Sequence, residues 1–342
     1  MDETTTECFH SIPCHDIVYI AEFAPYEWCA SLLAVGTKSR VSVFQYLNEP
    51  EYGITEEDGP KDALYRPLCD IQNACRVTSL SWCPSTFYRY PEMEDQIRQG
   101  LCIHVWVAAA GSDHRIRVFK TKLQGDIDTM VMEGHKDYIN SIAFSPVEED
   151  KLLVSTGDDM TCRIWDGDGV QKECFQLGAA GMSVAIHERE PRKVMVAQKN
   201  GVIKIFSLDL QQQIMSYDCW IVPLMGADWC RDDEDMIVAA AGTEWLVFQL
   251  SRSSYPVEKR LAHTDGARDV RWSKSHPTLI ATKGRPGKQI KVFSVRNHQV
   301  PLNTSLPIAY GMSWHYVYPI LAVGGDKKVD LYYCDQTKSD VR

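Results

Sequence analysis

A short alternating pattern of apolar and polar residues recurs along the chain. Each copy starts on an apolar or small residue, alternates small and polar positions, and closes on an aromatic residue or isoleucine. Period-two alternation with β-branched and aromatic residues is typical of a half-buried strand. The pattern therefore predicts seven equivalent strands. They are VYIAEF, VTSLSW, INSIAF, GMSVAI, LMGADW, ARDVRW and YGMSW, which close at Phe23, Trp82, Phe144, Ile186, Trp229, Trp272 and Trp314.

Two further strand patterns follow each copy. The second is small and apolar and usually runs into a turn residue such as glycine, as in LLAVG from Leu32 and IVAAAG from Ile237. The third ends on an aromatic residue, as in VSVF at Phe44 and CRIW at Trp165. Glycine, proline and Asp or Asn between these runs argue against helices. Each unit is therefore expected to be a small antiparallel sheet.

The spacing of the units predicts how the sheets assemble. The closing residues lie 59, 62, 42, 43, 43 and 42 positions apart, so the last four steps keep one period and the first two carry insertions. A sheet with two apolar faces cannot stand alone, and seven units of this period close into a β-propeller. We expect an all-β, seven-bladed β-propeller that spans residues 1–342 as a single domain.

The last repeat lacks an outer strand, because only a short polar tail follows its third strand near Tyr333. The stretch from Glu7 to Pro13 precedes the first repeat and is free to supply that strand. We therefore expect the propeller to be closed by an N-terminal strand in blade seven, which removes an open sheet edge.

Both insertions lie in the first third of the chain. Residues 48–62 hold six acids with Gly and Pro, which predicts a loop without regular structure. Residues 86–101 include Phe87, Tyr88 and Tyr90 and a stretch with the composition of a short helix. These aromatic residues either pack against a blade or face a partner.

Composition narrows the function classes. Lys and Arg number 36 against 46 Asp and Glu, a net charge of −10, which argues against non-specific nucleic-acid binding. The acidic start MDETTTE precedes no apolar stretch, so we expect no export signal and a chain in the cytosol or nucleus, with its twelve cysteines reduced. The apolar runs are shorter than the ~18 residues of a membrane span, so we expect no membrane insertion.

The third unit carries the most specific motif. EGHKDYINSIAFSPVEEDKLLVSTGDDMTCRIWD, from Glu133 to Asp166, contains the Gly-His and Trp-Asp signatures of a WD40 repeat. In that family a His, a strand hydroxyl, a turn Asp and the Trp form a hydrogen-bonded chain that stabilises the blade. The matching residues here are His135, Ser155, Asp159 and Trp165. The other six blades lack the Gly-His pair, so we expect one blade to hold the full network.

A wider resemblance covers most of the chain. The segments GMSV at Gly181, VAQKNGVIKIFSL at Val196, WLVFQLSRSSYPVEKR at Trp245, GMSWH at Gly311 and GGDKK at Gly324 occur in one order and blade phase. In these segments the chain resembles the small WD-repeat nucleoporins of the Y-shaped outer-ring complex of the nuclear pore. The stretch SRSSYP is the most distinctive, because no general WD40 constraint demands it.

The resemblance implies a non-catalytic scaffold subunit. Such a subunit docks on the helical part of a large nucleoporin and, with the other Y-complex subunits, supports pore assembly and the transport of proteins and mRNA. It implies residence in the nucleus, at the pore of the nuclear envelope, and in vertebrate relatives the complex also visits kinetochores in mitosis. It implies no cofactor, no small-molecule substrate, no direct nucleic-acid contact and no membrane insertion.

Two other binding functions and an enzyme remain as alternatives. Substrate receptors of cullin-type ubiquitin ligases often carry an Arg two residues after the Trp-Asp pair, whereas Trp165-Asp166 is followed by Gly167 and Asp168. A reader of histone tails or phosphopeptides requires an aromatic cage or an Arg cluster around the central channel. An enzyme requires a motif that the sequence lacks: we find no phosphate loop, no GxSxG and no HExxH.

Two clusters of residues are candidates for a metal site or a partner site. Cys8, His10, Cys14 and His15 lie within eight residues, but their spacing does not match a zinc motif, so we expect no metal there. Blade six carries a net charge of +7 between Arg268 and Arg296, which favours solvated loops or a contact patch for an acidic partner. The candidate contact residues are Arg268, Arg271, Lys283, Arg285, Lys288 and Lys291.

Overall fold

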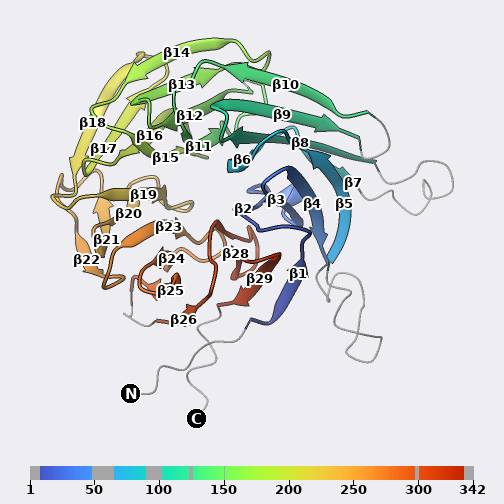
Figure 1. The fold of residues 1–342 in the computed structure, drawn as a ribbon. Coiled ribbons are helices and arrows are strands. Elements are labelled where there is room, and N and C mark those ends of the chain that lie inside the picture. The colour runs from blue at the N-terminus through green and yellow to red at the C-terminus, as the bar shows by residue number, and fades with distance from the viewer. Residues whose placement is uncertain are drawn as a thin grey trace.

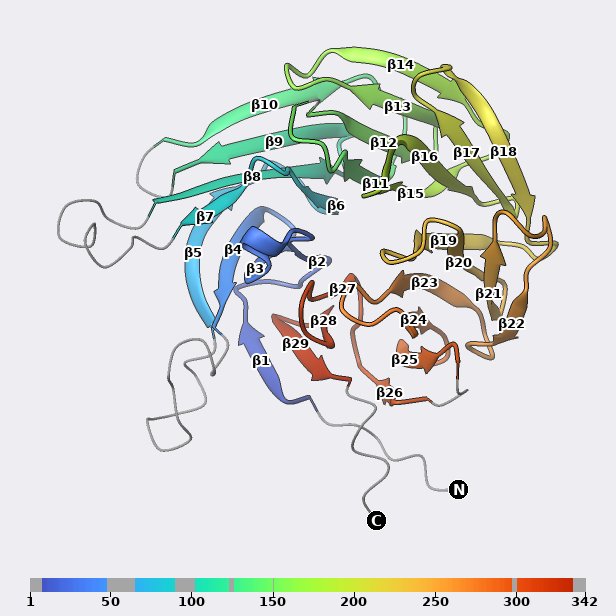
Figure 2. The same cartoon turned by 180° about the vertical axis from the view of Figure 1, so that it is seen from behind.

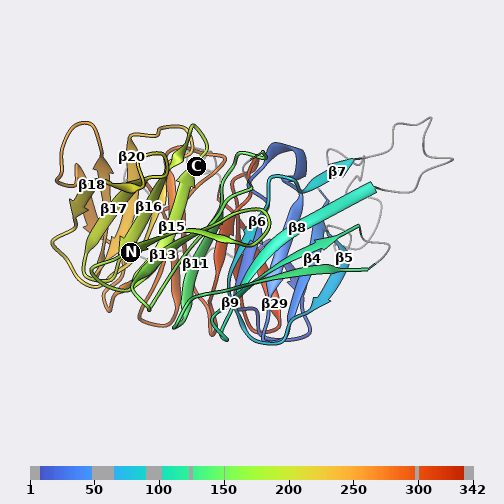
Figure 3. The ribbon, with the colours of Figure 1, turned by 90° about the horizontal axis from the view of Figure 1, so that it is seen from above.

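The computed structural model describes residues 8–47, 65–89, 102–122, 126–149, 151–296 and 300–334. Within these ranges the strands form seven antiparallel sheets, which are arranged as blades around a central channel (Figures 1 and 2). Figure 3 shows the same ring from the side as a wide, shallow body. The prediction of an all-β, seven-bladed propeller is confirmed.

The strands of blades one to six follow one another from the channel outward, and β7 (Phe87–Arg89) is added to the edge of blade two. The innermost strands of the seven blades are β2 (Ile20–Phe23), β6 (Val77–Trp82), β11 (Ile139–Phe144), β15 (Gly181–His187), β19 (Leu224–Trp229), β23 (Ala267–Trp272) and β27 (Met312–Trp314). The second strands are β3 (Leu32–Gly36), β8 (Cys102–Gly111), β12 (Leu153–Gly157), β16 (Glu190–Gln198), β20 (Met236–Ala241), β24 (Leu279–Gly284) and β28 (Ile320–Gly324).

The third and fourth positions complete each blade. The third strands are β4 (Arg40–Tyr46), β9 (Arg115–Thr121), β13 (Thr161–Trp165), β17 (Val202–Ser207), β21 (Glu244–Gln249), β25 (Gln289–Ser294) and β29 (Lys328–Tyr333). The outermost strands of blades one to six are β5 (Tyr65–Gln72), β10 (Asp128–Glu133), β14 (Gln171–Gln176), β18 (Gln212–Asp218), β22 (Glu258–Leu261) and β26 (Leu302–Ser305). A short 3₁₀ helix, η1 (Glu27–Cys29), follows β2.

Blade seven takes its outermost strand from the other end of the chain. β1 (His10–Pro13) pairs antiparallel with β29, with His10 opposite Leu331 and Pro13 opposite Lys328. The side chain of Ile12 in β1 is fully buried. The predicted closure by an N-terminal strand is therefore confirmed, and Figure 1 shows β1 beside β29 at the edge of the ring.

The hydrophobic core is divided into layers between the blades. Each of seven clusters of buried side chains takes its members from two neighbouring blades, and together the clusters cover every junction in the ring. Between blades four and five, for example, Ile203 of β17 packs in one cluster with Trp229 of β19 and Phe248 of β21. Each blade therefore depends on both of its neighbours for the burial of its two faces.

Polar side chains of the innermost strands join the blades around the channel. At five junctions a hydroxyl or carboxylate oxygen accepts a hydrogen bond from a backbone amide of the adjoining blade. The acceptors are Ser79, Ser81, Ser141, Ser183, Asp228 and Ser313. At the other two junctions an indole donates to a backbone carbonyl, from Trp82 to Glu22 and from Trp314 to Arg271. These bonds explain why polar residues alternate through the innermost strands.

Little of the two insertions is described. Residues 48–62 and 90–101 lie outside the described ranges, so the expectations for the acidic loop, the short helix and Tyr90 lie there too. Phe87 in β7 stacks on the His104 ring with centroids 4.6 Å apart, so this aromatic residue packs against blade two. That one domain spans residues 1–342 stays a prediction.

Candidate interaction surfaces

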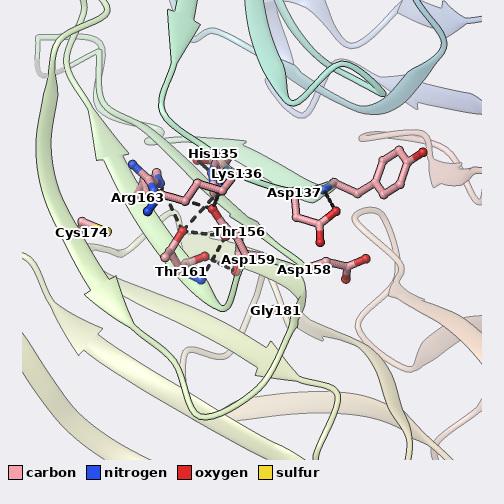
Figure 4. A network of polar contacts seen from close by, with 12 residues as sticks. His135, Lys136, Asp137, Thr156, Asp158, Asp159, Thr161, Arg163, Cys174 and Gly181 are labelled. Atoms are coloured by element: carbon pink, nitrogen blue, oxygen red, sulfur yellow. Dashed lines mark hydrogen bonds and ion pairs between the residues drawn. The ribbon is translucent and has the colours of Figure 1, made fainter.

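The four WD40 motif residues of blade three form a continuous hydrogen-bonded chain. Trp165 Nε1 donates to Ser155 Oγ (2.8 Å), Ser155 Oγ lies 2.7 Å from His135 Nε2, and His135 Nδ1 lies 2.9 Å from Asp159 Oδ2. An indole only donates and a carboxylate only accepts, so Ser155 donates to Nε2 and His135 donates from Nδ1 to Asp159. Figure 4 shows His135 and Asp159 close together in blade three, with Thr161 beside them.

Asp159 is the most heavily bonded member of this network. Its carboxylate also accepts hydrogen bonds from Thr161 Oγ1 (2.7 Å) and from the amides of Lys136 and Thr161 (both 3.1 Å). Burial favours a raised pKa for this carboxyl, but the bonds from His135, Thr161 and Lys136 lower its pKa well below the ordinary value. The chemistry of this network suits the stabilisation of blade three.

Blade six contains a related hydrogen-bonded network, which the sequence analysis did not predict. His263 Nε2 lies 3.0 Å from Thr282 Oγ1, and His263 Nδ1 lies 3.3 Å from Gln289 Oε1. Burial lowers the pKa of His263 to about 4, so the ring is neutral at pH 7. The missed signal is the spacing: His263 precedes Trp272 by nine residues, as His135 precedes Phe144, but Ala262 replaces the glycine of the Gly-His pair.

The six cations singled out in blade six lie in several places. Arg268, Arg271 and Lys283 line one mouth of the central channel. Lys288, on the turn after β24, places Nζ 5.4 Å from the centroid of the Tyr310 ring at that mouth. Arg285 is exposed on the same turn, and Lys291 lies on β25 opposite Asn303 of β26. Their contact with a partner stays a prediction.

The channel holds a small group of buried charges. Arg271 projects from β23 between the two mouths, and its Nε has no hydrogen-bond partner among the described residues. Burial favours a lowered pKa for this guanidinium, but the carboxylates of Asp269, Glu22 and Asp228 raise its pKa above the ordinary value. Burial raises the pKa of Glu22 to about 7, although Arg271 and Lys274 partly offset that effect.

The N-terminal Cys and His residues are engaged in packing and hydrogen bonding. Cys8 Sγ donates to the His10 carbonyl (2.8 Å), the His10 ring lies 5.7 Å from the Tyr65 ring, and Cys14 Sγ donates to the Ile12 carbonyl (3.7 Å). Among the described residues, no group of three or more His, Cys, Asp or Glu side chains is arranged to hold a metal ion. Every cysteine side chain that the structure describes is free.

None of the helices in the described ranges is long and apolar enough to cross a membrane.

The side of blades four and five exposes an apolar surface that the sequence did not predict. Trp220 and Val222 lie between β18 and β19, Tyr255 precedes β22, and Leu261 ends it. Their exposed fractions are 72%, 64%, 61% and 60%. We call these four residues the apolar ridge. The sequence singled out SRSSYP, which includes Tyr255, but nothing in it places Trp220 beside a residue thirty-five positions later.

The comparisons with known proteins find a WD repeat in this chain and nucleoporins that match it over nearly its whole length. A family model described as WD domain, G-beta repeat matches residues 128–166, the unit that holds the blade-three network. Nucleoporin Nup37 of Homo sapiens is 36% identical over 325 residues, which cover 94% of this chain and 95% of the relative. Nup37 of Mus musculus is 36% identical over 96% of this chain and 97% of the relative. Nup37 of Drosophila melanogaster is 29% identical over 94% and 95%.

Proposed function

Because the chain belongs to the Nup37 family of WD-repeat nucleoporins, we propose that it is a non-catalytic scaffold subunit of the nuclear pore outer ring. In this role it docks on the helical part of a large nucleoporin, joins the other subunits of the Y-complex, and supports pore assembly and the transport of proteins and mRNA. The chain then resides at the pore in the nuclear envelope.

One observation carries this proposal. The match to human Nup37 runs through 94% of this chain and 95% of that relative, so it includes surface loops as well as blade cores. A shared fold alone would not support a shared function, because propellers serve many unrelated functions. The seven interlocked inter-blade layers add a physical argument, since they make a rigid body that binds partners with little loss of conformational entropy.

Affinity purification tests the proposal. A tagged copy of the full chain is purified from nuclear extract, and the proteins that accompany it are quantified by mass spectrometry and crosslinked. The proposal predicts near-stoichiometric recovery of Y-complex nucleoporins, with crosslinks to a helical one. Recovery of a cullin adaptor or chromatin subunits, with nucleoporins at background, would refute it. Imaging the same tagged copy through mitosis tests whether it accompanies the complex to kinetochores.

A second function is favoured by the channel. Arg268, Arg271 and Lys283 line one mouth together with Asp269, whose Oδ2 lies 3.7 Å from Lys283 Nζ. The carboxylates of Glu22 and Asp228 also act on Arg271, but its Nε lacks a hydrogen-bond partner among the described residues. This arrangement suits a reader of anionic peptides. Fluorescence anisotropy with a labelled phosphopeptide library tests it, with Lys199, an exposed cation on the turn between β16 and β17, as the control position. Binding that Arg271→Gln abolishes and Lys199→Gln preserves would support the reader, and no binding at millimolar concentration would exclude it.

A further inference from the structure

We propose that the apolar ridge on blades four and five is the docking surface for an acidic segment of a pore subunit that presents apolar side chains. The inference rests on the proposed function and names the face of the propeller that performs it. Exposed apolar clusters of this kind mark interaction sites, because an isolated soluble protein gains nothing by keeping them in water.

Local geometry holds the two aromatic rings outward. Trp220 has a φ of +56°, a left-handed conformation that is unfavourable for a bulky residue, and its amide donates to Asp218 Oδ1 (2.7 Å). The Tyr255 amide donates to Ser253 Oγ (2.9 Å) in a second local turn. The Trp220 and Tyr255 rings then stack with an interplanar angle of 11° and centroids 6.4 Å apart.

The edge of blade five extends this aromatic pair into a row. β22 is the outermost strand of its sheet, and its side chains alternate between the two faces of the strand. Lys259 and Leu261 are exposed, and so are Val257 and Tyr255 at the preceding alternate positions. The loop that carries Trp220 and Val222 contacts blade five near the end of β22 at Leu261. There the Gly242 amide donates to the Pro223 carbonyl (2.9 Å), and Leu261 lies opposite Glu244.

A second exposed tryptophan shows what a purely structural role looks like. Trp28 is 52% exposed, yet its Nε1 donates to the Thr86 carbonyl (2.8 Å) and its ring stacks on Tyr26 with centroids 5.1 Å apart. Trp28 therefore joins η1 of blade one to blade two. The Trp220 indole makes no such bond within the described ranges, and its only ring partner there, Tyr255, is itself exposed. Aromatic side chains in such settings are the usual anchors of protein interfaces.

Charge at the ridge selects the partner's chemistry. Arg252 and Lys259 are exposed beside Tyr255, and their side chains have no ion-pair partner among the described residues. Among the acids nearby in the chain, Glu258 pairs with Arg260 Nε (2.9 Å), Asp218 accepts from the Trp220 amide, and Asp235 accepts from Ser251. The exposed cations Arg252 and Lys259 are therefore available to a partner at the border of the apolar ridge. An acidic segment with apolar side chains complements both features.

The experiment compares tagged full-length variants in nuclear extract, with each pore subunit quantified separately. The double variant W220A/Y255A is expected to recover the helical nucleoporin at least tenfold less than the unaltered chain, because it removes both anchors. L210A removes a side chain that is 63% exposed on the turn before β18, and it is expected to leave recovery within twofold. K259E is expected to reduce recovery about threefold to tenfold and keeps both rings.

The outcomes separate the ridge from the proposed function. If the unaltered chain recovers no pore subunit, the proposed function fails. If it does and W220A/Y255A recovers as much, the ridge proposal fails while the function stands. If W220A/Y255A melts at a lower temperature, K259E decides between the two, since Lys259 is exposed and the variant keeps both aromatic rings. Unchanged recovery by K259E would overturn the proposal.

Crosslinking identifies what covers the ridge. A photo-crosslinker at position 222 is expected to capture the same nucleoporin, whereas one at position 170, where Val170 is 56% exposed in blade three, is not. Capture of a second copy of this chain from position 222, together with a dimer of the purified protein in light scattering, would overturn the proposal in favour of self-association.

Discussion

Blades three and six both place a histidine nine residues before the aromatic residue that closes the innermost strand, and both bond its Nε2 to a strand hydroxyl. They differ at Nδ1. In blade three His135 bonds to the carboxylate of Asp159 at 2.9 Å, whereas in blade six His263 faces the neutral amide of Gln289 at 3.3 Å. The carboxylate gathers further donors around it, and the amide does not. An ionised acceptor therefore collects several hydrogen bonds where a neutral amide makes one. The buried charge is stable only while those bonds are present.

Removal of the side chain that accepts from His Nδ1 should destabilise blade three more than blade six. Asp159→Ala leaves His135 Nδ1, Thr161 Oγ1 and two amides without their partner, and we expect a loss of about 3 kcal/mol in the free energy of unfolding. Gln289→Ala removes the longer contact to His263 and the bond from the Gln289 amide to Asn303 Oδ1, and it is expected to cost about 1 kcal/mol. Urea denaturation of both variants measures the difference. Equal losses would show that the carboxylate adds nothing beyond a single bond.

Acid should loosen blade six before blade three. Because burial lowers the pKa of His263 to about 4, the unfolded chain binds this proton at higher pH than the folded chain. The stability that neutral His263 contributes is complete above about pH 6.5 and is lost as the pH falls towards 4, by about 3 kcal/mol. Asp159 has a lowered pKa, so its contribution is lost only below about pH 4.

Hydrogen exchange resolved by blade checks this order. Burial also lowers the pKa of His315 in blade seven to about 4, so global unfolding reports both histidines and a local measurement is needed. Amides of β24 and β25 are expected to lose protection between pH 6.5 and 4, while those of β12 and β13 keep theirs. Simultaneous loss in both blades would contradict the expected difference between the two networks.

Replacing Trp165 by phenylalanine gives the third strand of blade three the same closing residue as that of blade six, which ends on Phe293. Trp165→Phe removes the bond to Ser155 Oγ (2.8 Å) and is expected to cost about 1 kcal/mol beyond the change in packing. A double-mutant cycle with Ser155→Ala isolates that bond. If the two effects simply add, the indole and the hydroxyl are not coupled.

A carboxylate in blade six should have the smallest effect on stability. Gln289→Glu gives His263 an ionised acceptor, and we expect the pKa of His263 to rise by about one unit while the free energy of unfolding changes by less than about 1 kcal/mol. The gain is limited, because the Gln289 amide also donates to Asn303 Oδ1 (2.9 Å) and that bond is lost. NMR titration of the His263 ring measures the shift, and Gln289→Met, which adds no charge, is the control.

Most of the fold can be predicted from the sequence, because the inner three strands of each blade are buried. Their apolar residues therefore form alternating or continuous runs that are visible in the sequence. The outer strands were not located individually: in β14, for example, Gln171 and Lys172 are exposed and Phe175 is only half-buried, so the apolar pattern fades. Blade closure was predictable, because one repeat was short of a strand and one N-terminal stretch was unassigned.

The candidate surfaces were less readable, because they depend on which way each side chain points. Arg271 and Lys291 both fall in the basic part of blade six, yet Arg271 projects into the channel and Lys291 lies on a third strand far from it. The WD40 residues of blade three were found because they form a known motif. Trp220 and Tyr255 meet through a turn geometry that leaves no short-range sequence signal.

The pairing of β1 with β29 makes the order of synthesis matter. β1 leaves the ribosome before the other strands of the propeller, but its partner is made more than 300 residues later. At roughly 5–20 residues per second, β1 waits about 15–60 s before it pairs. Blades two to six can stack in the meantime, since each needs only its neighbours in the chain. The ring as a whole closes only once β29 has emerged, so a nascent chain held on the ribosome before that point presents an open propeller with two unprotected faces.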